Sequence, residues 1–411
     1  MPPYFAFKGF RNPKLLAGLL LLAFFAQAVW LMQRELSQSD SPDLSESIRV
    51  GEGWKQWHGR GIAGAPLRDA TTSGEDGVAD PAHDSSFDSE HSPLLYLLTA
   101  APMLVWSRFD SESFQYWRWL SRIPFLACGV FLGASLWYVA RRLCGNTGGF
   151  IALTLYCFSP SLIQASAAWH TEPEIVGAWG AFGAVFTAIA VAHTLYAPRE
   201  VVLWNWRRIL LLGVSLAIAV GSQFCYIVLV PVTLAFLLYV APVRRKAATA
   251  IWLAAMIAAF VLLFSAYFFH PHVFARSIRH AVFWGATWQG FHVLGVYKQV
   301  AVRMGRACPA LALALPVSIV TYAVWPRTRY FGNTAPLLMA LLFLVLGIAH
   351  PDTAGAGFLL AATPFLFIFV AGVLADLVET RYRALVSACT LGLLFAYVVW
   401  NLVSLYQVPR G

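Results

Sequence analysis

The sequence predicts an all-α polytopic membrane protein, and two features of its composition carry that prediction. Of its 411 residues, 59% are apolar and only 12% are charged, whereas a soluble globular domain carries about 25% charged residues. Apolar runs recur along the chain at roughly 20 residues, the length that a helix needs to cross a bilayer. These features exclude soluble enzymes, secreted disulfide-rich modules and disordered chains.

About eleven apolar segments have the length of membrane-spanning helices. In chain order they are 15–33, 120–140, 148–163, 175–195, 209–223, 225–242, 248–269, 308–325, 335–349, 357–377 and 384–405. Between the fifth and sixth, Gly221-Ser222-Gln223 must turn the chain. Residues 93–106 are apolar but short, and we expect a re-entrant or interfacial helix there.

The first segment has two interpretations. It follows Lys8, Arg11 and Lys14, and Ala26-Gln27-Ala28 resembles a signal-peptide cleavage site. We favour a retained first helix over a cleaved signal peptide, because the apolar run continues through Trp30-Leu31-Met32. The loop that follows faces outward in either case.

Lys and Arg predict the sidedness, since they accumulate in short cytoplasmic loops. One set of loops has few acids, only Glu200, Asp376 and Glu379, and carries 15 of the 29 Lys and Arg side chains: Lys8, Arg11, Lys14, Arg141, Arg142, Arg199, Arg207, Arg208, Arg244, Arg245, Lys246, Arg327, Arg329, Arg381 and Arg383. That set is predicted to be cytoplasmic, so residues 34–92, residues 270–307 and the C-terminus face outward. The net charge of +9 therefore reports topology and no nucleic-acid partner.

A polar, acidic insert is the main organisational feature of a chain that we interpret as one transmembrane domain over 1–411. Residues 34–92 hold 12 of the 20 acidic residues. We interpret the acids from Asp69 to Asp88 as solvated loop charges. Three other acids lie beside hydrophobic segments on the outer face: Glu46, Glu90 and Glu172. Such carboxylates are candidates for a general base or for oxygen ligands of a divalent metal ion.

Basic residues form a complementary set on the same face. Arg118 and Arg122 stand at the start of the second span, and residues 270–307 add Arg276, Arg279, Lys298, Arg303 and Arg306 among aromatic residues. Arginine matches phosphate oxygens with two parallel donors. Contact with lipid headgroups and binding of a phosphorylated lipid are both consistent with this pattern.

The cysteines and one histidine motif give less evidence of a functional site. The six cysteines fall in or beside the spans with spacings of neither a disulfide framework nor a zinc site. His270-Pro271-His272 has no third metal ligand in its motif, and we interpret it as a helix end.

The outward motifs, in their order, resemble the integral-membrane glycosyltransferases with the C-type fold, which include protein O-mannosyltransferases and the aminoarabinose transferases that modify lipid A. The resemblance is strongest over residues 14–195. Its matching residues are Ser45-Glu46 with Gly53-Trp54, Glu90-His91-Ser92-Pro93-Leu94, Arg122, Arg141-Arg142, Ser159-Pro160 and Thr171-Glu172. Gly357–Phe367 loosely matches the family's late outer-side helix.

This resemblance implies a polyprenyl-phosphate sugar as the donor and an outward-facing carboxylate that acts on the acceptor hydroxyl as a base or helps to bind a metal. By position, Glu46 is expected to be that carboxylate, Glu90 a supporting acid, and Glu172 the replacement of an Asp. The expected ligands of the donor phosphate are His91, Arg122, Lys298 and Arg303. We expect Glu46 and Glu90 to converge beside Arg122, in one cavity with basic residues of 270–307.

The sequence departs from the family pattern in three places. Ser45 stands where the first Asp of an Asp-Glu pair is expected, so Glu46 or Asp43 has to substitute for it. Ser92 replaces the first Pro of a Pro-Pro, and Ala354-Gly355-Ala356-Gly357 replaces an Arg-Tyr. The alternatives to an active enzyme are therefore a non-catalytic relative and a flippase or transporter of a lipid-linked sugar. Charges gathered at one face favour the enzyme over a transporter, which places them near the midplane. The expected location is the bacterial inner membrane, with the active site facing the periplasm.

Overall fold

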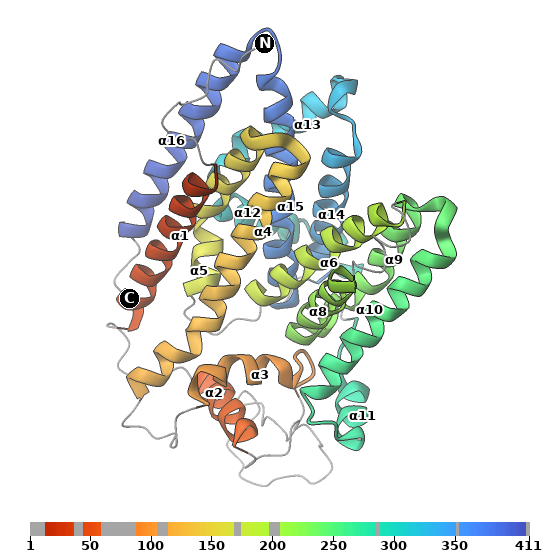
Figure 1. Ribbon diagram of the computed structural model, residues 1–411. Helices are drawn as coiled ribbons and strands as arrows, with labels where there is room; N and C mark the ends of the chain where they lie inside the picture. The colour runs from red at the N-terminus through yellow and green to blue at the C-terminus, as the bar shows by residue number, and fades with distance from the viewer. Residues whose placement is uncertain are drawn as a thin grey trace. The chain divides into compact units, whose positions relative to one another are not determined.

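The predicted all-α membrane fold is confirmed by the computed structural model (Figure 1). It describes residues 13–36, 44–58, 88–104, 114–167, 174–196, 206–284, 288–350 and 353–407, and these contain helices and turns but no strand. The chain divides into two compact units. Unit 1 comprises 1–38, 129–167 and 288–411, and unit 2 comprises 39–128 and 168–287. The single domain over 1–411 stays a prediction.

Seven helices in the described residues are long and apolar enough to cross a membrane. They are α1 (Pro13–Leu36), α4 (Phe114–Cys157), α6 (Glu174–Thr194), α10 (Arg245–Ser265), α14 (Phe331–Ala349), α15 (Thr353–Val378) and α16 (Arg383–Gln407). An eighth span is formed if α12 (Leu294–Ala307) and α13 (Pro309–Val324), which bend by 108° at Cys308, are taken together.

All eleven predicted segments are mainly helical, although some lie in shorter helices. Segment 209–223 is α8 (Trp206–Ser222), and 225–242 is a 3-10 turn, η2 (Phe224–Val228), followed by α9 (Leu229–Val240). Gln223 is extended between them, which confirms the expected turn. Residues 93–106 begin as the short helix α3 (Pro93–Ala100) and a 3-10 turn, η1 (Ala101–Met103), in agreement with a segment too short to span.

Segments 120–140 and 148–163 meet in α4, where only Gly145 leaves the helical conformation, with φ 72° and ψ −174°. That region of backbone space is open almost only to glycine, so Gly145 makes the break. After α4 the chain is interrupted at Phe158 and Ser159 and continues as α5 (Pro160–Ala167). Proline at the first position of α5 suits a helix start, because its missing N–H is not needed there.

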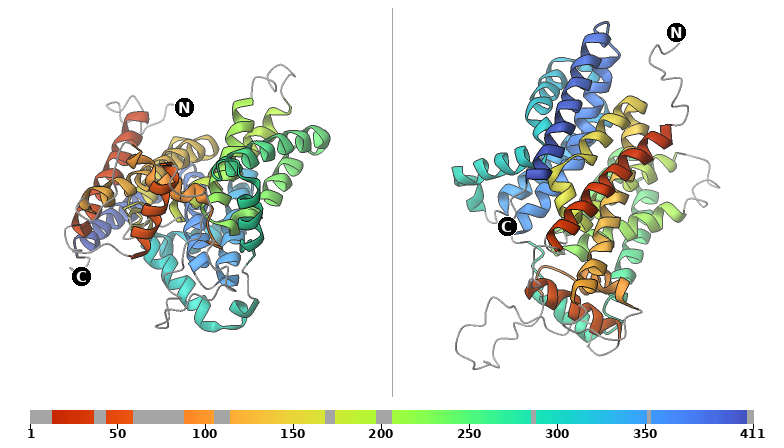
Figure 2. Two further views of the ribbon diagram at one scale, coloured as in Figure 1. Left: turned by 90° about the horizontal axis from the view of Figure 1, so that it is seen from below. Right: turned by 90° about the vertical axis from the view of Figure 1, so that its left-hand side faces the viewer.

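In unit 1, polar side chains tie the first helix to the last. Gln27 Nε2 donates to the carbonyl of Cys157 at 3.1 Å, and Asn401 Nδ2 donates to Gln27 Oε1 at 2.9 Å. Arg34 donates to the carbonyl of Leu405 at 3.2 Å. Figures 1 and 2 show α1 and α16 side by side. Such bonds supplement van der Waals packing between membrane helices, which have no hydrophobic drive to associate in lipid.

In unit 2, small residues let α6, α8 and α10 pack closely (Figure 1). A Cβ on Gly180 of α6 would lie 2.5 Å from the backbone nitrogen of Ala219, and one on Gly213 would lie 2.5 Å from the carbonyl oxygen of Ala255. Close backbone approach through Gly and Ala is typical of helix pairs in membranes.

Candidate functional site

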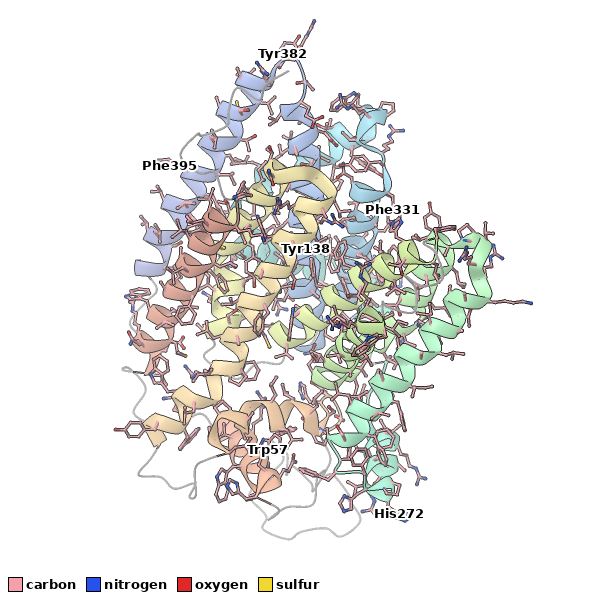
Figure 3. The ribbon with its side chains drawn as sticks, viewed as in Figure 1. Trp57, Tyr138, His272, Phe331, Tyr382 and Phe395 are labelled. Carbon is pink, nitrogen blue, oxygen red and sulfur yellow. The ribbon has the colours of Figure 1, made fainter. Side chains whose placement is uncertain are left out.

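Two short helices of unit 2 carry the outward motifs. The chain around Glu46 forms α2 (Leu44–Trp57), which packs against α3. Gly53 allows the contact, since a Cβ there would lie 2.2 Å from the carbonyl oxygen of Tyr96. Trp57 lies where the two helices meet (Figure 3), and its Nε1 donates to the carbonyl of Leu97 at 2.8 Å.

An apolar cluster completes this packing and explains the Gly-aromatic pair of the motif. Trp54 is buried with Val50 on α2, Ala100 and Met103 on the α3–η1 segment, and Trp117 at the start of α4. Gly53 and Trp54 are therefore required for packing: the first for close approach, the second for filling the core. The side chain of Glu46 lies outside the described residues, although its backbone belongs to α2.

The segment before α3 is fixed by backbone hydrogen bonds to two other parts of unit 2. The Phe224 N–H donates to the carbonyl of Glu90 at 2.8 Å, and the Val282 N–H donates to the carbonyl of Ser89 at 2.7 Å. Ser92 donates to the carbonyl of Gly221 through both its N–H, at 3.2 Å, and its hydroxyl, at 2.7 Å. Ser89, Glu90 and Ser92 are thus each bonded to another part of unit 2.

These bonds give a physical reason for Ser92 where the family pattern has proline. The Ser92 N–H is a used donor, and proline has none. The Ser92 hydroxyl also accepts from the Leu94 N–H at 3.2 Å and caps α3, with Pro93 at the first helical position. The substitution therefore keeps the helix start while adding two bonds to Gly221.

Asp88 is wrongly predicted to be a solvated loop charge. Its Oδ1 accepts from the N–H groups of Glu90, at 2.9 Å, and His91, at 3.1 Å. Its Oδ2 accepts from His91 Nδ1 at 2.8 Å and from the Tyr96 hydroxyl. The sequence signals that could have revealed it are an Asp three residues before His91 and a turn ahead of a helix cap.

The protonation states of this cluster follow from its surroundings. Burial disfavours ionisation of Asp88, but the charge of His91 and the hydrogen bonds from His91, Tyr96 and Glu90 outweigh it and hold the pKa of Asp88 well below its usual range. Burial, followed by the charge of Asp88, raises the pKa of Tyr96 well above its usual value. Asp88 is therefore a carboxylate that accepts, and Tyr96 a neutral hydroxyl that donates.

The two predicted site residues beside Asp88 differ in exposure. The Glu90 side chain is exposed, while its backbone groups bond to Asp88 and Phe224. The His91 side chain is only 14% exposed and forms an ion pair with Asp88 when protonated. The structure thus places Glu90 and His91 in one turn of chain.

Arg122 lies deeper in the protein than its predicted place at the mouth of a span. Helix α4 begins at Phe114, so Arg122 is in its third turn, and its side chain is 1% exposed. Arg118, one turn earlier on the same helix, is 4% exposed. A buried guanidinium is costly unless it is paired, so burial distinguishes these two arginines from the exposed Lys298 and Arg303.

Segment 270–307, which is predicted to face outward, is divided between the two units. Its first part contains α11 (Pro271–His280), which confirms that His270-Pro271-His272 is a helix start, with His270 at the N-cap. His272 lies in the first turn of α11, and its side chain points away from the other helices (Figure 3). Lys298 and Arg303 lie on α12 of unit 1, with both side chains exposed.

The expected convergence of Glu46 and Glu90 beside Arg122 stays a prediction. Glu172 and Asp43 lie outside the described residues, as does the Glu46 side chain. Within the residues that the structure describes, no three His, Cys, Asp or Glu side chains gather as a metal site would require.

Comparisons with known proteins give structural matches alone. No family model matches the sequence, and no curated protein matches it significantly. ArnT from Cupriavidus metallidurans bound to undecaprenyl phosphate matches with a TM-score of 0.59 and 14% identity, over 95% of this chain and 70% of that one. The apo state of the same protein matches with a TM-score of 0.57 and 13% identity, over 90% of this chain and 61% of that one.

The archaeal oligosaccharyltransferase AglB from Archaeoglobus fulgidus, in complex with an inhibitory peptide and a dolichol-phosphate, matches with a TM-score of 0.54 and 14% identity. The match covers 95% of this chain and 55% of AglB. This chain thus spans between about half and seven tenths of the solved proteins that it resembles. At such identities the likeness shows the fold, and that fold is the one predicted from the outward motifs: the fold of the C-type integral-membrane glycosyltransferases.

Proposed function

We propose that this protein is a glycosyltransferase that moves a sugar from a polyprenyl-phosphate donor to a lipid, glycan or protein acceptor at the periplasmic face of the bacterial inner membrane. The observation that carries the proposal is the fold shared with ArnT bound to undecaprenyl phosphate and AglB bound to dolichol-phosphate. Support comes from the motif around Glu90 and His91, which the backbone of unit 2 holds rigidly.

The proposed chemistry has two requirements. The acceptor hydroxyl must lose a proton as it attacks the anomeric carbon, and a carboxylate base suits that task. We assign this role to Glu46, with Glu90 and Glu172 as supporting acids. The leaving polyprenyl phosphate must be stabilised by cations, and we assign this role to His91, Arg122, Lys298 and Arg303. Nucleic acid has no part in the proposal.

A divalent metal ion is compatible with the same residues. Oxygen ligands such as the carboxylates of Glu46, Glu90 and Glu172 suit Mg²⁺ or Mn²⁺. A bound ion would neutralise charge on the donor phosphate. The proposed base and phosphate ligands act in the same way with or without it, so the transfer assay is run with EDTA and with each metal restored.

The test is transfer of radiolabelled sugar from purified polyprenyl-phosphate sugars by the detergent-solubilised protein. We expect Glu46→Gln to lower turnover by at least about 100-fold, the usual size of a general-base contribution. Glu52→Gln is a matched control, because Glu52 lies on the same helix and pairs with Lys55 at 2.7 Å. It should retain turnover within about twofold, as expected for loss of an exposed ion pair.

The outcomes separate the alternatives. Equal turnover of Glu46→Gln and the wild type would reject Glu46 as the base. Absence of transfer from every donor, with undecaprenyl phosphate still bound, would indicate a non-catalytic relative, for which Ser45 in place of Asp is the motivating observation. Movement of a fluorescent polyprenyl-phosphate sugar across proteoliposomes without transfer would indicate a flippase.

A further inference from the structure

The pair Asp88–His91 has the geometry of an oriented imidazole. His91 Nδ1 lies 2.8 Å from Asp88 Oδ2, and both side chains are less than one fifth exposed. Because an ionised carboxylate can only accept, Nδ1 must carry the proton. The orientation of the ring is therefore set by a neighbour outside the family motif on which the proposed function relies.

Asp88 is itself fixed, which makes it suitable as a support. Its Oδ1 is occupied by two backbone N–H groups, of Glu90 and His91, and its Oδ2 by His91 Nδ1 and the Tyr96 hydroxyl. Tyr96 stands on α3, whose start is capped by Ser92. The Asp88 carboxylate thus links Glu90 and His91 to α3, and its four hydrogen bonds fix the orientation of its side chain.

His91 Nε2 has no hydrogen-bond partner among the described residues. With Nδ1 committed to Asp88, Nε2 is the only ring nitrogen that a ligand can reach. When Nε2 also carries a proton, the Asp88 carboxylate stabilises the positive ring, and Nε2–H can donate a charge-assisted hydrogen bond to a phosphate oxygen.

We propose that Asp88 is a positioning residue that fixes the Nδ1 proton of His91 and presents Nε2 to the phosphate of the lipid-linked donor. The role of the phosphate rests on the proposed function, whereas the position of the proton does not. Tyr96 assists by holding the Asp88 oxygen that faces His91.

The two Asp88 oxygens have different hydrogen-bond partners, so Asp88→Asn tests the proposal directly. The backbone N–H groups need an acceptor, so the asparagine oxygen must face them and its NH₂ must face His91 and Tyr96. His91 Nδ1 then has to accept, and the proton of the neutral ring moves to Nε2. The variant keeps the size of the side chain and its two bonds to the backbone, but reverses the tautomer.

The measurement is ¹⁵N NMR of the full-length protein in detergent, with ¹⁵N-labelled histidine and His91→Gln to assign the His91 signals. For the neutral ring, we expect the His91 proton on Nδ1 in the wild type and on Nε2 in Asp88→Asn. Tyr96→Phe leaves the carboxylate in place and should keep the proton on Nδ1. A wild-type ring protonated on Nε2 alone would overturn the proposal, and this result needs no variant.

A second measurement tests the ligand. Binding of undecaprenyl phosphate should weaken about tenfold in Asp88→Asn, because the ring loses the carboxylate that orients Nε2 toward the phosphate, and Asp88→Glu should recover part of the loss. In the transfer assay this change should appear in KM more than in kcat. Unchanged binding in Asp88→Asn, with the tautomer reversed, would reject the phosphate as the partner of Nε2. Absence of transfer by the wild type would reject the proposed function while leaving the tautomer result intact.

Discussion

At the scale of single residues, the unexpected feature is how much of the outer site depends on Asp88. In the sequence it is one of many acids in a polar stretch between two apolar segments. In the structure it accepts from two side chains and two backbone N–H groups. Of these partners, only Glu90 and His91 are close in sequence. Tyr96 approaches because α3 turns its hydroxyl back toward Asp88, and no local pattern shows that.

The depressed pKa of Asp88 makes a prediction about acid stability. A carboxyl whose pKa is lower in the folded than in the unfolded state stabilises the fold above its unfolded pKa, and that stability is lost as the pH falls toward the folded pKa. Asp88→Asn should therefore lower the free energy of unfolding by about 1 to 3 kcal/mol at neutral pH. The difference from the wild type should begin to shrink below about pH 5 and should continue to shrink below pH 3, because the loss starts near the usual Asp pKa and ends at the lower folded pKa.

Thermal unfolding in detergent, followed by tryptophan fluorescence over that pH range, checks this prediction. Glu52→Gln, which removes a carboxylate of the same exposed fraction from the same unit but leaves the Asp88 cluster intact, serves as the control and should show a small difference. A constant difference between Asp88→Asn and the wild type from neutral pH down to pH 3 would contradict an ionised, hydrogen-bonded Asp88.

At the scale of elements, the spans and the positions of some breaks were predictable, whereas the local geometry of the breaks and the short helices was not. Long apolar runs identify helices such as α6 and α16 directly, because nothing else crosses a bilayer as a single segment. The break inside α4 depends on one backbone conformation at Gly145. The helical state of 44–57 depends on burying Trp54 against α3 and Trp117. The apolar runs place the α4 break between 140 and 148 but do not identify the backbone conformation that makes it, and the helix over 44–57 does not appear in a hydropathy pattern.

The α2–α3 contact makes a testable prediction at Gly53. In an exposed helix interior, Gly→Ala usually stabilises by about 0.5 to 1 kcal/mol. Gly53→Ala should instead destabilise by about 1 to 3 kcal/mol, because the new Cβ would lie 2.2 Å from the Tyr96 carbonyl oxygen and 2.8 Å from the Ala100 Cβ. The backbone oxygen cannot move away without breaking α3.

Gly18→Ala is the matched control, since Gly18 lies within α1 and has no atom within 4 Å of its would-be Cβ. It should be neutral or stabilising in the same thermal unfolding measurement. Gly53→Ala as stable as Gly18→Ala would mean that α2 and α3 pack less closely than the structure shows. A separation of the two helices should also lower transfer activity, because the backbone of Glu46 belongs to α2.

At the scale of the whole molecule, the fold agrees with the resemblance stated from the motifs, although identity to the solved structures is only 13–14%. The motifs concern a few residues, whereas the structural match covers at least 90% of the chain. The motifs predict that the charged residues share one cavity, and these residues come from both units. Lys298 and Arg303 belong to unit 1, and Glu90, His91 and Arg122 to unit 2.

The proposed chemistry also requires one orientation in the membrane, and labelling of single cysteines tests it. Of the six native cysteines, Cys389 is the one with an exposed side chain among the described residues, so Cys389→Ser is the background. The Ser73→Cys variant places a cysteine in the predicted periplasmic loop over 34–92. Val243→Cys lies beside Arg244 and Arg245 in a predicted cytoplasmic loop, and Val243 is 86% exposed.

A membrane-impermeant maleimide added to spheroplasts should label Ser73→Cys at once and Val243→Cys only after lysis. The reason is the excess of Lys and Arg in the loops assigned to the cytoplasm, because positively charged short loops remain inside during insertion. The reverse pattern would place Glu90 and His91 in the cytoplasm. The proposed transfer at the periplasmic face would then be wrong even if the fold and the Asp88–His91 pair are correct, so this experiment separates the location of the reaction from its chemistry.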